Sequence, residues 1–208
     1  MAQTYGIALA GGDTTRGPLA ISIQVMGWVP TGQALQRNGA QVNDDVYVSG
    51  YLGDAAGGLA CLHEDVTATG YLAQRFFNPT PRLPLGQWLL GKASSAIDVS
   101  DGLLQDLGHI LSQSQVGAIL NLEQLPISKA LAAKMPLWQQ EQLALAGGED
   151  FELCFTMPEQ WRQQVQDYAT LHGLPISRIG QIEAATGLRL ERNGHAVPVP
   201  DNLGWQHF

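Results

Sequence analysis

Two carboxylates and a hydroxyl group, those of Asp98, Asp101 and Ser100, separate an apolar strand-like run from an apolar helix-like run in SSAIDVSDGLLQDLGHIL (residues 94–111). In a strand, the side chains of Asp98 and Ser100 project to one face, and Asp101 begins the turn. Ser100 or Asp101 could cap the helix that begins near Gly102. Capping does not account for Asp98, since a carboxylate inside an apolar run should be paired, hydrogen-bonded or metal-bound. These residues alone favour equally a helix cap and a Mg²⁺ site, which would also favour phosphate at the helix start.

Two further loops place acidic residues after a pair of glycines. AGGDTTRG contains Gly12 and Asp13, and AGGEDFELCF contains Glu149 and Asp150. Paired glycines let the backbone approach a ligand closely, and the acids and hydroxyls behind them suit a hard cation. A tight turn is the somewhat better explanation of the first loop, and for the second loop the turn and the ligand site are equally good explanations.

Cationic and aromatic side chains give weaker signals. Arg16 and Arg37 lie in glycine-containing loops, where a guanidinium group could reach phosphate oxygens, although a solvated surface position is the better explanation of a lone arginine. Trp205, in the terminal GWQHF, could stack on a flat ligand or anchor the chain end. The sequence contains no P-loop motif, no Ser-His-Asp or Cys-His arrangement and no zinc-type spacing.

The elements that must position these residues alternate in type. β-rich apolar runs predict strands at residues 5–10, 19–29, 46–50, 96–99, 117–122 and 151–157, and two or three more before residue 199. Helical patterns appear at residues 55–64, 70–77, 84–93, 103–111, 127–135, 136–146 and 158–173. Interleaved strands and helices with a strand-rich end favour an α/β or α+β layered domain over an all-β sandwich.

Composition limits the classes of function. The chain has 208 residues, of which 45% are hydrophobic and 14% charged, so it can bury a core and is not disordered. A net charge of -8 argues against nucleic acid as a partner, although divalent cations could bridge its carboxylates to phosphates. Cys61 and Cys154 lie in apolar runs and are expected to be free thiols. No run is long enough to cross a membrane and no signal peptide is visible, so we expect a cytoplasmic protein.

Four motifs together resemble one family. LAGGDTTRGP, SAIDVSDGLLQDLGHI, LALAGGEDFELCFT and the terminal GWQHF resemble thiamine-monophosphate kinases, a family in the superfamily of aminoimidazole ribonucleotide synthetase and selenophosphate synthetase. The order and spacing of the motifs are preserved over essentially the whole chain. The resemblance implies transfer of the γ-phosphoryl group of ATP to thiamine monophosphate, with several Mg²⁺ ions. Such a reaction depends on charge neutralisation and in-line positioning more than on a covalent nucleophile.

The resemblance also implies which residues contact each ligand. The implied contacts are Gly12, Asp13, Arg37 and Ser100 for ATP, Asp13, Asp98 and Asp101 for Mg²⁺, and Glu149 and Trp205 for thiamine monophosphate. No residue is implied as a covalent catalyst, because the substrate's own phosphate is the attacking group.

The family pattern includes a longer N-terminal region, with an Asp-Asp metal motif and the strands through which two subunits pair. The resemblance therefore implies that residues 1–30 are the last strands of an N-terminal ATP-binding domain, 31–37 a linker and 38–208 a C-terminal α/β domain, a mixed sheet covered by helices. We expect a homodimer that associates through residues 19–29, and little or no activity from this chain alone. A non-catalytic module that binds nucleotide or thiamine phosphates, or serves in assembly, is the alternative.

Overall fold

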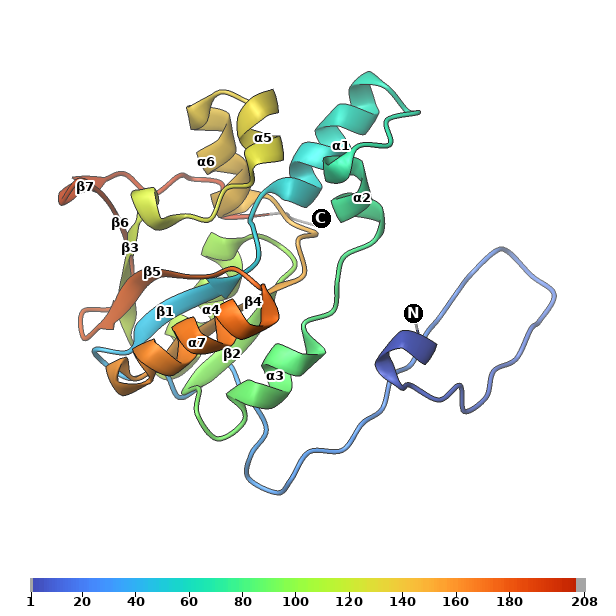
Figure 1. Cartoon of the computed structure of the whole chain (residues 1–208), viewed down its shortest axis with the longest axis horizontal. Coiled ribbons are helices and arrows are strands. Elements are labelled where there is room, and N and C mark those ends of the chain that lie inside the picture. The colour runs from blue at the N-terminus through green and yellow to red at the C-terminus, as the bar shows by residue number, and fades with distance from the viewer. Residues whose placement is uncertain (1, 205–208) are drawn as a thin grey trace. The chain divides into compact units, whose positions relative to one another are not determined.

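The computed structural model describes residues 2–204, and the chain divides into two compact units, Met1–Ala34 and Leu35–Phe208 (Figure 1). In the first unit a 3-10 turn spans Gln3–Tyr5, and the other described residues form no helix or strand. The β-sheet and the α-helices all lie in the second unit.

The first unit differs from the sequence-based expectation. The apolar side chains of residues 19–29 are exposed, with Leu19 at 93% and Ile23 at 84% of full exposure. A strand needs a neighbour to bind its backbone N–H and C=O groups, and residues 2–34 form no strand that could serve. The strands predicted at 5–10 and 19–29 are therefore wrong for this structure, and the reason is the absence of a pairing strand in these residues.

A seven-stranded mixed sheet forms the centre of the second unit, in the order β2-β4-β1-β5-β3-β6-β7. The strands are β1 Asp45–Ser49, β2 Ser95–Val99, β3 Gly117–Asn121, β4 Glu152–Met157, β5 Ile176–Glu183, β6 Gly187–Arg192 and β7 His195–Val197. Only β3 and β6 pair in parallel, and the other pairs are antiparallel. β2 is an edge strand, and its Ala96 N–H donates a 2.9 Å hydrogen bond outward to the carbonyl of Gln36.

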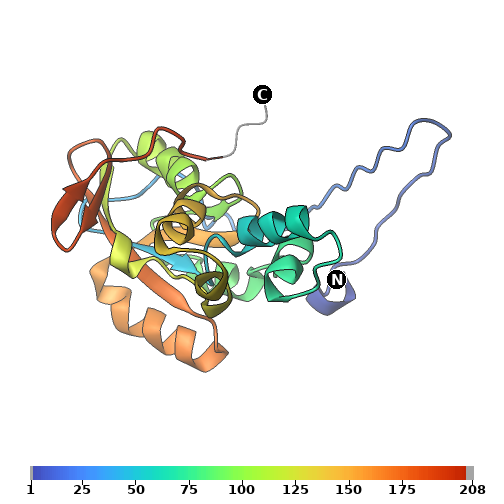
Figure 2. The same ribbon diagram turned by 90° about the horizontal axis from the view of Figure 1, so that it is seen from above.

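Helices cover both faces of the sheet. The α-helices are α1 Asp54–Glu64, α2 Tyr71–Phe77, α3 Leu83–Leu89, α4 Leu103–Ser114, α5 Lys129–Lys134, α6 Leu137–Ala146 and α7 Arg162–His172. Figure 2 shows the orange α7 and the light-green α4 on opposite sides of the sheet.

Each face of the sheet has its own apolar core. On the α4 face the strand residues Val48, Ile97 and Val99 pack with the helix α4. On the α7 face Tyr47 and Phe155 stack, with ring centroids 5.3 Å apart, among residues of α3 and α7. The alternation of side chains along β1, β2 and β4 therefore supplies both cores, which confirms the layered α/β fold that the sequence predicted.

A group of helices stands at one end of the sheet, where β1 leads into α1 (Figure 1). Helix α1 contacts α2, α5 and α6. No helix within residues 2–204 is both long enough and apolar enough to cross a bilayer. Both cysteines are free thiols as expected, and Cys154 is buried in β4.

Candidate functional site

A cleft of about 500 Å³ lies where the helices at the end of the sheet meet the turn after β2. One part of its wall is apolar and comes from α1, α2 and α6. The lining side chains include Ala56, Leu59, Phe76 and Leu143, with Ser100, Glu149 and Asn202 as polar members. An apolar wall with a few convergent polar groups is the usual character of a small-molecule site.

The turn between β2 and α4 is held by a residue of the helix that follows it. One carboxylate oxygen of Asp106, which is buried, accepts hydrogen bonds from the backbone N–H groups of Ser100 (2.9 Å), Asp101 (3.0 Å) and Gly102 (3.2 Å). Neither Ser100 nor Asp101 caps the helix, because the N-cap is Gly102 and it makes no side-chain capping bond. The cap hypothesis for Ser100 and Asp101 is therefore wrong, and the N–H groups before the helix are bound instead by the carboxylate of Asp106, a residue within the helix.

The loop 147–151 lies directly against this turn. The N–H of Glu149 donates to the carbonyl of Ser100 at 2.8 Å, and the N–H of Phe151 donates to the carbonyl of Val99 at 2.9 Å. Gly148 is required here, since a Cβ atom at this position would stand 2.5 Å from the Ser100 carbonyl oxygen. Two of the motifs that are far apart in the sequence thus form one wall of the cleft.

Asp150 joins the same loop to the start of α1. Its side chain is fully buried, and its two oxygens accept hydrogen bonds from the N–H groups of Gly53 (2.6 Å) and Ala55 (3.0 Å). Burial raises the pKa of Asp150 to about 7, although the two N–H donors and nearby Arg75 favour the charged form. The carboxylate therefore acts as a helix cap supplied by a distant loop.

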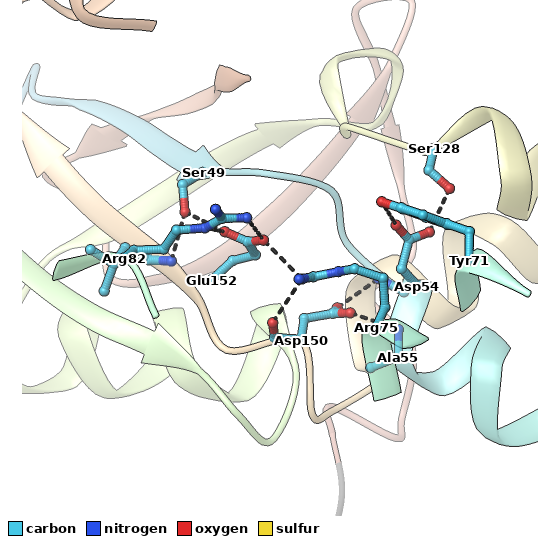
Figure 3. Close-up of polar contacts among 11 residues, drawn as sticks. Ser49, Asp54, Ala55, Tyr71, Arg75, Arg82, Ser128, Asp150 and Glu152 are labelled. Atoms are coloured by element: carbon cyan, nitrogen blue, oxygen red, sulfur yellow. Dashed lines mark hydrogen bonds and ion pairs between the residues drawn. The ribbon is translucent and has the colours of Figure 1, made fainter. Parts of the chain in front are cut away.

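A network of buried charges connects this loop to α2 and to the segment before α3 (Figure 3). One oxygen of Glu152 accepts from Arg75 at 2.9 Å and from Arg82 at 2.6 Å, and the other accepts from Arg82 and from Ser49, both at 2.6 Å. Arg75 also donates to the backbone carbonyl of Asp150 at 3.1 Å. In the described part of the chain no buried side-chain polar atom lacks a hydrogen-bond partner.

A second buried carboxylate, that of Asp54, stands at the first residue of α1 (Figure 3). It accepts hydrogen bonds from the hydroxyl groups of Ser128 (2.6 Å) and Tyr71 (2.9 Å). Burial raises the pKa of Asp54, and burial together with this carboxylate raises that of Tyr71. Asp54 therefore joins α1 to α2 and to the residue that caps α5.

Four of the predicted site residues of the second unit line two different clefts. Ser100 and Glu149 line the cleft described above, whereas Arg37 and Asp98 line another of about 590 Å³ at the outer edge of β2. Asp98 lies within an apolar run but its side chain is exposed, so the structure does not show the burial on which the expectation of a pairing, hydrogen-bonding or metal partner rests. Its neighbours Ile97 and Val99 project to the other face and pack in the core on the α4 side, whereas Asp98 projects to the face on which Ala96 is only partly buried.

The remaining predicted residues are placed as follows. Gly12 and Asp13 lie in the first unit, where Asp13 is exposed and accepts a 2.8 Å bond from the N–H of Thr14. Asp101 is half-buried at the start of α4, beside Gln105 at 3.4 Å. Trp205 lies outside the described residues.

Carboxylate oxygens are suitable Mg²⁺ ligands, so the chemistry of Asp13, Asp98 and Asp101 fits that ion. Within residues 2–204, however, no three His, Cys, Asp or Glu side chains gather closely enough to hold a metal ion. The side chains described in this chain do not by themselves build a closed metal site.

Sequence reasoning missed several residues that shape the cleft. Asp106 lies at helical spacing with the buried Leu103, Leu107 and Ile110, and a lone acid on an apolar helix face was a usable signal. Arg75 and Arg82 gave no signal, because their partner Glu152 is far from them in the sequence.

Comparison with known proteins gives a family for this fold. Residues 41–193 match the family model "AIR synthase related protein, C-terminal domain". The thiamine-monophosphate kinase of Escherichia coli (strain K12) is 46% identical over 211 residues, which cover 98% of this chain and 64% of that enzyme. The chain therefore spans less than two thirds of the length of this relative.

Solved structures agree with the sequence match. The thiamine-monophosphate kinase from Stenotrophomonas maltophilia K279a has a TM-score of 0.75 at 43% identity, over 81% of this chain and 56% of that one. The structure "AaThiL complexed with AMPPCP and TMP" has a TM-score of 0.67 at 31% identity, over 84% of this chain and 54% of that one. The family model covers well over half of the sequence, so the chain belongs to the AIR synthase related family, within which it resembles the thiamine-monophosphate kinases.

Proposed function

We propose that this chain takes part in Mg²⁺-dependent transfer of the γ-phosphoryl group of ATP to thiamine monophosphate, which yields ADP and thiamine diphosphate. The observation that carries the proposal is the contact between two motifs that share one cleft. The Glu149 N–H donates to the Ser100 carbonyl at 2.8 Å, so the GGED loop and the VSDG turn line the same cavity. The names of the similar enzymes, and of a similar structure that holds AMPPCP and TMP, support the choice of substrates.

The chemistry of the cleft suits thiamine monophosphate. Its thiazolium ring is a cation, and Glu149 supplies a carboxylate at the mouth of the cleft. Phe76, Leu59 and Leu143 supply apolar contacts for flat heteroaromatic rings. We assign the substrate to this cleft, with Ser100 on the side that faces the nucleotide and Trp205 as an additional aromatic contact.

The nucleotide would extend toward the edge of β2. Arg37 and Asp98 line the cleft there, and a guanidinium group can bind phosphate oxygens. We assign Gly12, Asp13 and Arg37 to ATP, and Asp13, Asp98 and Asp101 to Mg²⁺. The ion would lower the repulsion between the γ-phosphate of ATP and the phosphate of thiamine monophosphate. We also propose that the chain acts in the cytoplasm as a homodimer.

A binding and turnover experiment tests the proposal. Titration calorimetry of the chain with thiamine monophosphate and Mg-ATP, followed by an assay for thiamine diphosphate with and without Mg²⁺, separates binding from chemistry. We expect thiamine monophosphate to bind, and Glu149→Gln to weaken that binding by roughly tenfold, since the variant lacks the negative charge opposite the thiazolium cation. Absence of any binding of either ligand would contradict the proposal.

A binding module without catalysis is the second candidate. It is favoured by the absence of a gathered set of metal ligands within residues 2–204. Binding of both ligands with no thiamine diphosphate formed, even from a version extended at the N-terminus with the rest of the family pattern, would support this candidate over the kinase. Formation of thiamine diphosphate that stops when Mg²⁺ is chelated would exclude it.

A further inference from the structure

Two residues of the loop 147–151 have an unusual backbone conformation. Glu149 has φ 68° and Phe151 has φ 50°, and neither is glycine. A positive φ is costly for residues with a Cβ atom, and such strain persists only where the surrounding structure enforces it. The fully buried Asp150 lies between these two residues.

The enforcing contacts are all on the backbone or on Asp150. The N–H groups of Glu149 and Phe151 are bound by the carbonyls at the end of β2. The carboxylate of Asp150 holds the N–H groups of Gly53 and Ala55, and Arg75 holds the Asp150 carbonyl at 3.1 Å. The loop is thus fixed to β2, to α1 and to α2, as Figure 3 shows for the last two.

We propose that Asp150 is a positioning residue of the substrate cleft: by binding the first N–H groups of α1 it holds Glu149 in its left-handed conformation and presents that carboxylate to the substrate. This inference rests on the proposed function, in which Glu149 contacts thiamine monophosphate. Asp150 does not line the cleft and acts only through its neighbour.

The same contacts set the width of the cleft. Helix α1 carries Ala56 and Leu59 on one wall, and Glu149 stands on the loop opposite. Because the Asp150 carboxylate bonds to α1 at 2.6 and 3.0 Å, it fixes the distance between the two walls. Arg75 adds α2, whose next residue, Phe76, lines the cleft as well.

The chain offers a matched control for a purely structural role. Asp150 and Asp54 are both buried aspartates whose carboxylates lie at the start of α1, Asp150 reaching it from the loop 147–151. In Asp150→Asn the new NH₂ group faces a backbone N–H, which cannot accept a hydrogen bond. In Asp54→Asn the partners are the hydroxyl groups of Tyr71 and Ser128, which can turn to accept one. Asp54 makes no bond to the loop 147–151 among those described.

A double-mutant cycle in the full chain tests the coupling between Asp150 and Glu149, with thiamine monophosphate as the titrated ligand. We expect Asp150→Asn alone to weaken binding by roughly tenfold, and to add no further loss in a Glu149→Gln background. Asp54→Asn should leave the affinity within about twofold, even where it lowers the melting temperature. Additive losses from Asp150→Asn and Glu149→Gln would overturn the inference, since Asp150 would then act independently of Glu149.

A second readout does not depend on the substrate. Amide–Hα couplings and Cα chemical shifts of Glu149 and Phe151, measured by NMR, report whether φ stays positive. We expect both residues to leave the left-handed region in Asp150→Asn and to keep it in Asp54→Asn. If the conformation is retained in Asp150→Asn, the inference fails; if it changes while Glu149→Gln binds normally, the proposed contact of Glu149 fails instead. Should Asp150→Asn not fold, Asp150→Glu keeps both acceptor oxygens and should shift the same signals.

Discussion

At the scale of single residues, Glu152 is the point where three segments of the chain meet. Its carboxylate is 1% exposed and accepts hydrogen bonds from Arg75, Arg82 and Ser49. Two guanidinium groups on one buried carboxylate hold three segments together, because the charged form of Glu152 needs these donors in a poorly solvated place. The network therefore fixes α2 and the start of α3 against the sheet.

Replacing this carboxylate by an amide should cost stability. In Glu152→Gln we expect the free energy of unfolding to fall by about 3–5 kcal/mol, since the buried Arg75 loses the negative charge of the carboxylate to which it donates. Urea denaturation of the two proteins measures the difference. The control is Glu159→Gln, because Glu159 pairs with Arg162 from a side chain that is 66% exposed, and such pairs contribute only about 0–1 kcal/mol. Equal losses in the two variants would show that the network does not contribute as described.

Residue-level contacts were the least predictable part of the site. The sequence marked Ser100, Asp101 and Glu149 by their place between apolar runs and glycines, and the structure puts Ser100 and Glu149 on one cleft. It gave no indication that Asp150 binds backbone N–H groups, and for Asp106 it offered only the signal of a lone acid on an apolar helix face, because such bonds depend on distances between segments that only the fold determines. Asp98 lies in an apolar run and is nevertheless exposed, since a sequence does not show which parts of a sheet face the other elements cover.

At the scale of elements, the segment 19–29 has the pattern of a strand and no strand structure. Its alternating apolar side chains are exposed, among them Ile21, Ile23 and Trp28. Backbone groups without a sheet partner and a continuous apolar surface favour association with another chain.

We expect this segment to drive self-association. Light scattering over a range of concentrations should show a mass above that of one chain, and the double substitution Ile21→Lys with Ile23→Lys should lower it. Ser22→Lys is the control. Ser22 lies between Ile21 and Ile23, so this substitution adds a charge to the segment and leaves its apolar side chains in place. A monomeric mass at high concentration would contradict the expectation.

Elements of the second unit could be predicted better than those of the first. The periodicity of residues 103–111 gave α4 and the alternation of 151–157 gave β4, because each buries a full apolar face against its neighbours. The same alternation failed at 19–29, where no neighbouring strand is available. A local pattern therefore predicts an element only when the fold supplies the surface that the element needs.

At the scale of the whole molecule, several buried carboxyl groups make stability depend on pH. Burial raises the pKa of Asp150 to about 7 and also raises that of Asp54 and Asp106 above the ordinary value of 3.8. The native chain then binds protons that the unfolded chain has released. These groups therefore stabilise the native state below the ordinary pKa, and this contribution is lost as the pH rises through the raised values.

The measurement is the free energy of unfolding, from urea denaturation at about pH 5 and about pH 8, of the natural chain and of Asp150→Asn. We expect the natural chain to lose more stability than the variant does over this interval, since only the natural chain carries the titrating carboxyl group. The difference between the two pH dependences isolates Asp150 from the other titrating groups. If the free energy of unfolding changed equally with pH in the two proteins, the pKa of Asp150 would not be raised.

The overall architecture was predictable, since interleaved strands and helices in a chain with 45% hydrophobic residues leave few alternatives to a layered α/β fold. The strand order β2-β4-β1-β5-β3-β6-β7 was not, because it depends on pairings between strands as distant as β1 and β5. That order places β2 at the edge of the sheet, beside the cleft that Asp98 lines.

The turn before α4 has one more consequence, for how the molecule can hold phosphate. Consecutive N–H groups that point to one spot form an anion-binding hollow, which many proteins fill with a phosphate. Here the Asp106 carboxylate fills the hollow, and in the first turn of the helix the Leu203 carbonyl accepts the N–H of Gln105 at 3.1 Å. At this helix start a carboxylate of the protein itself occupies the place that a phosphate could otherwise take. A phosphate bound beside Asp98 and Asp101, in a chain of net charge -8, has to be balanced by cations instead.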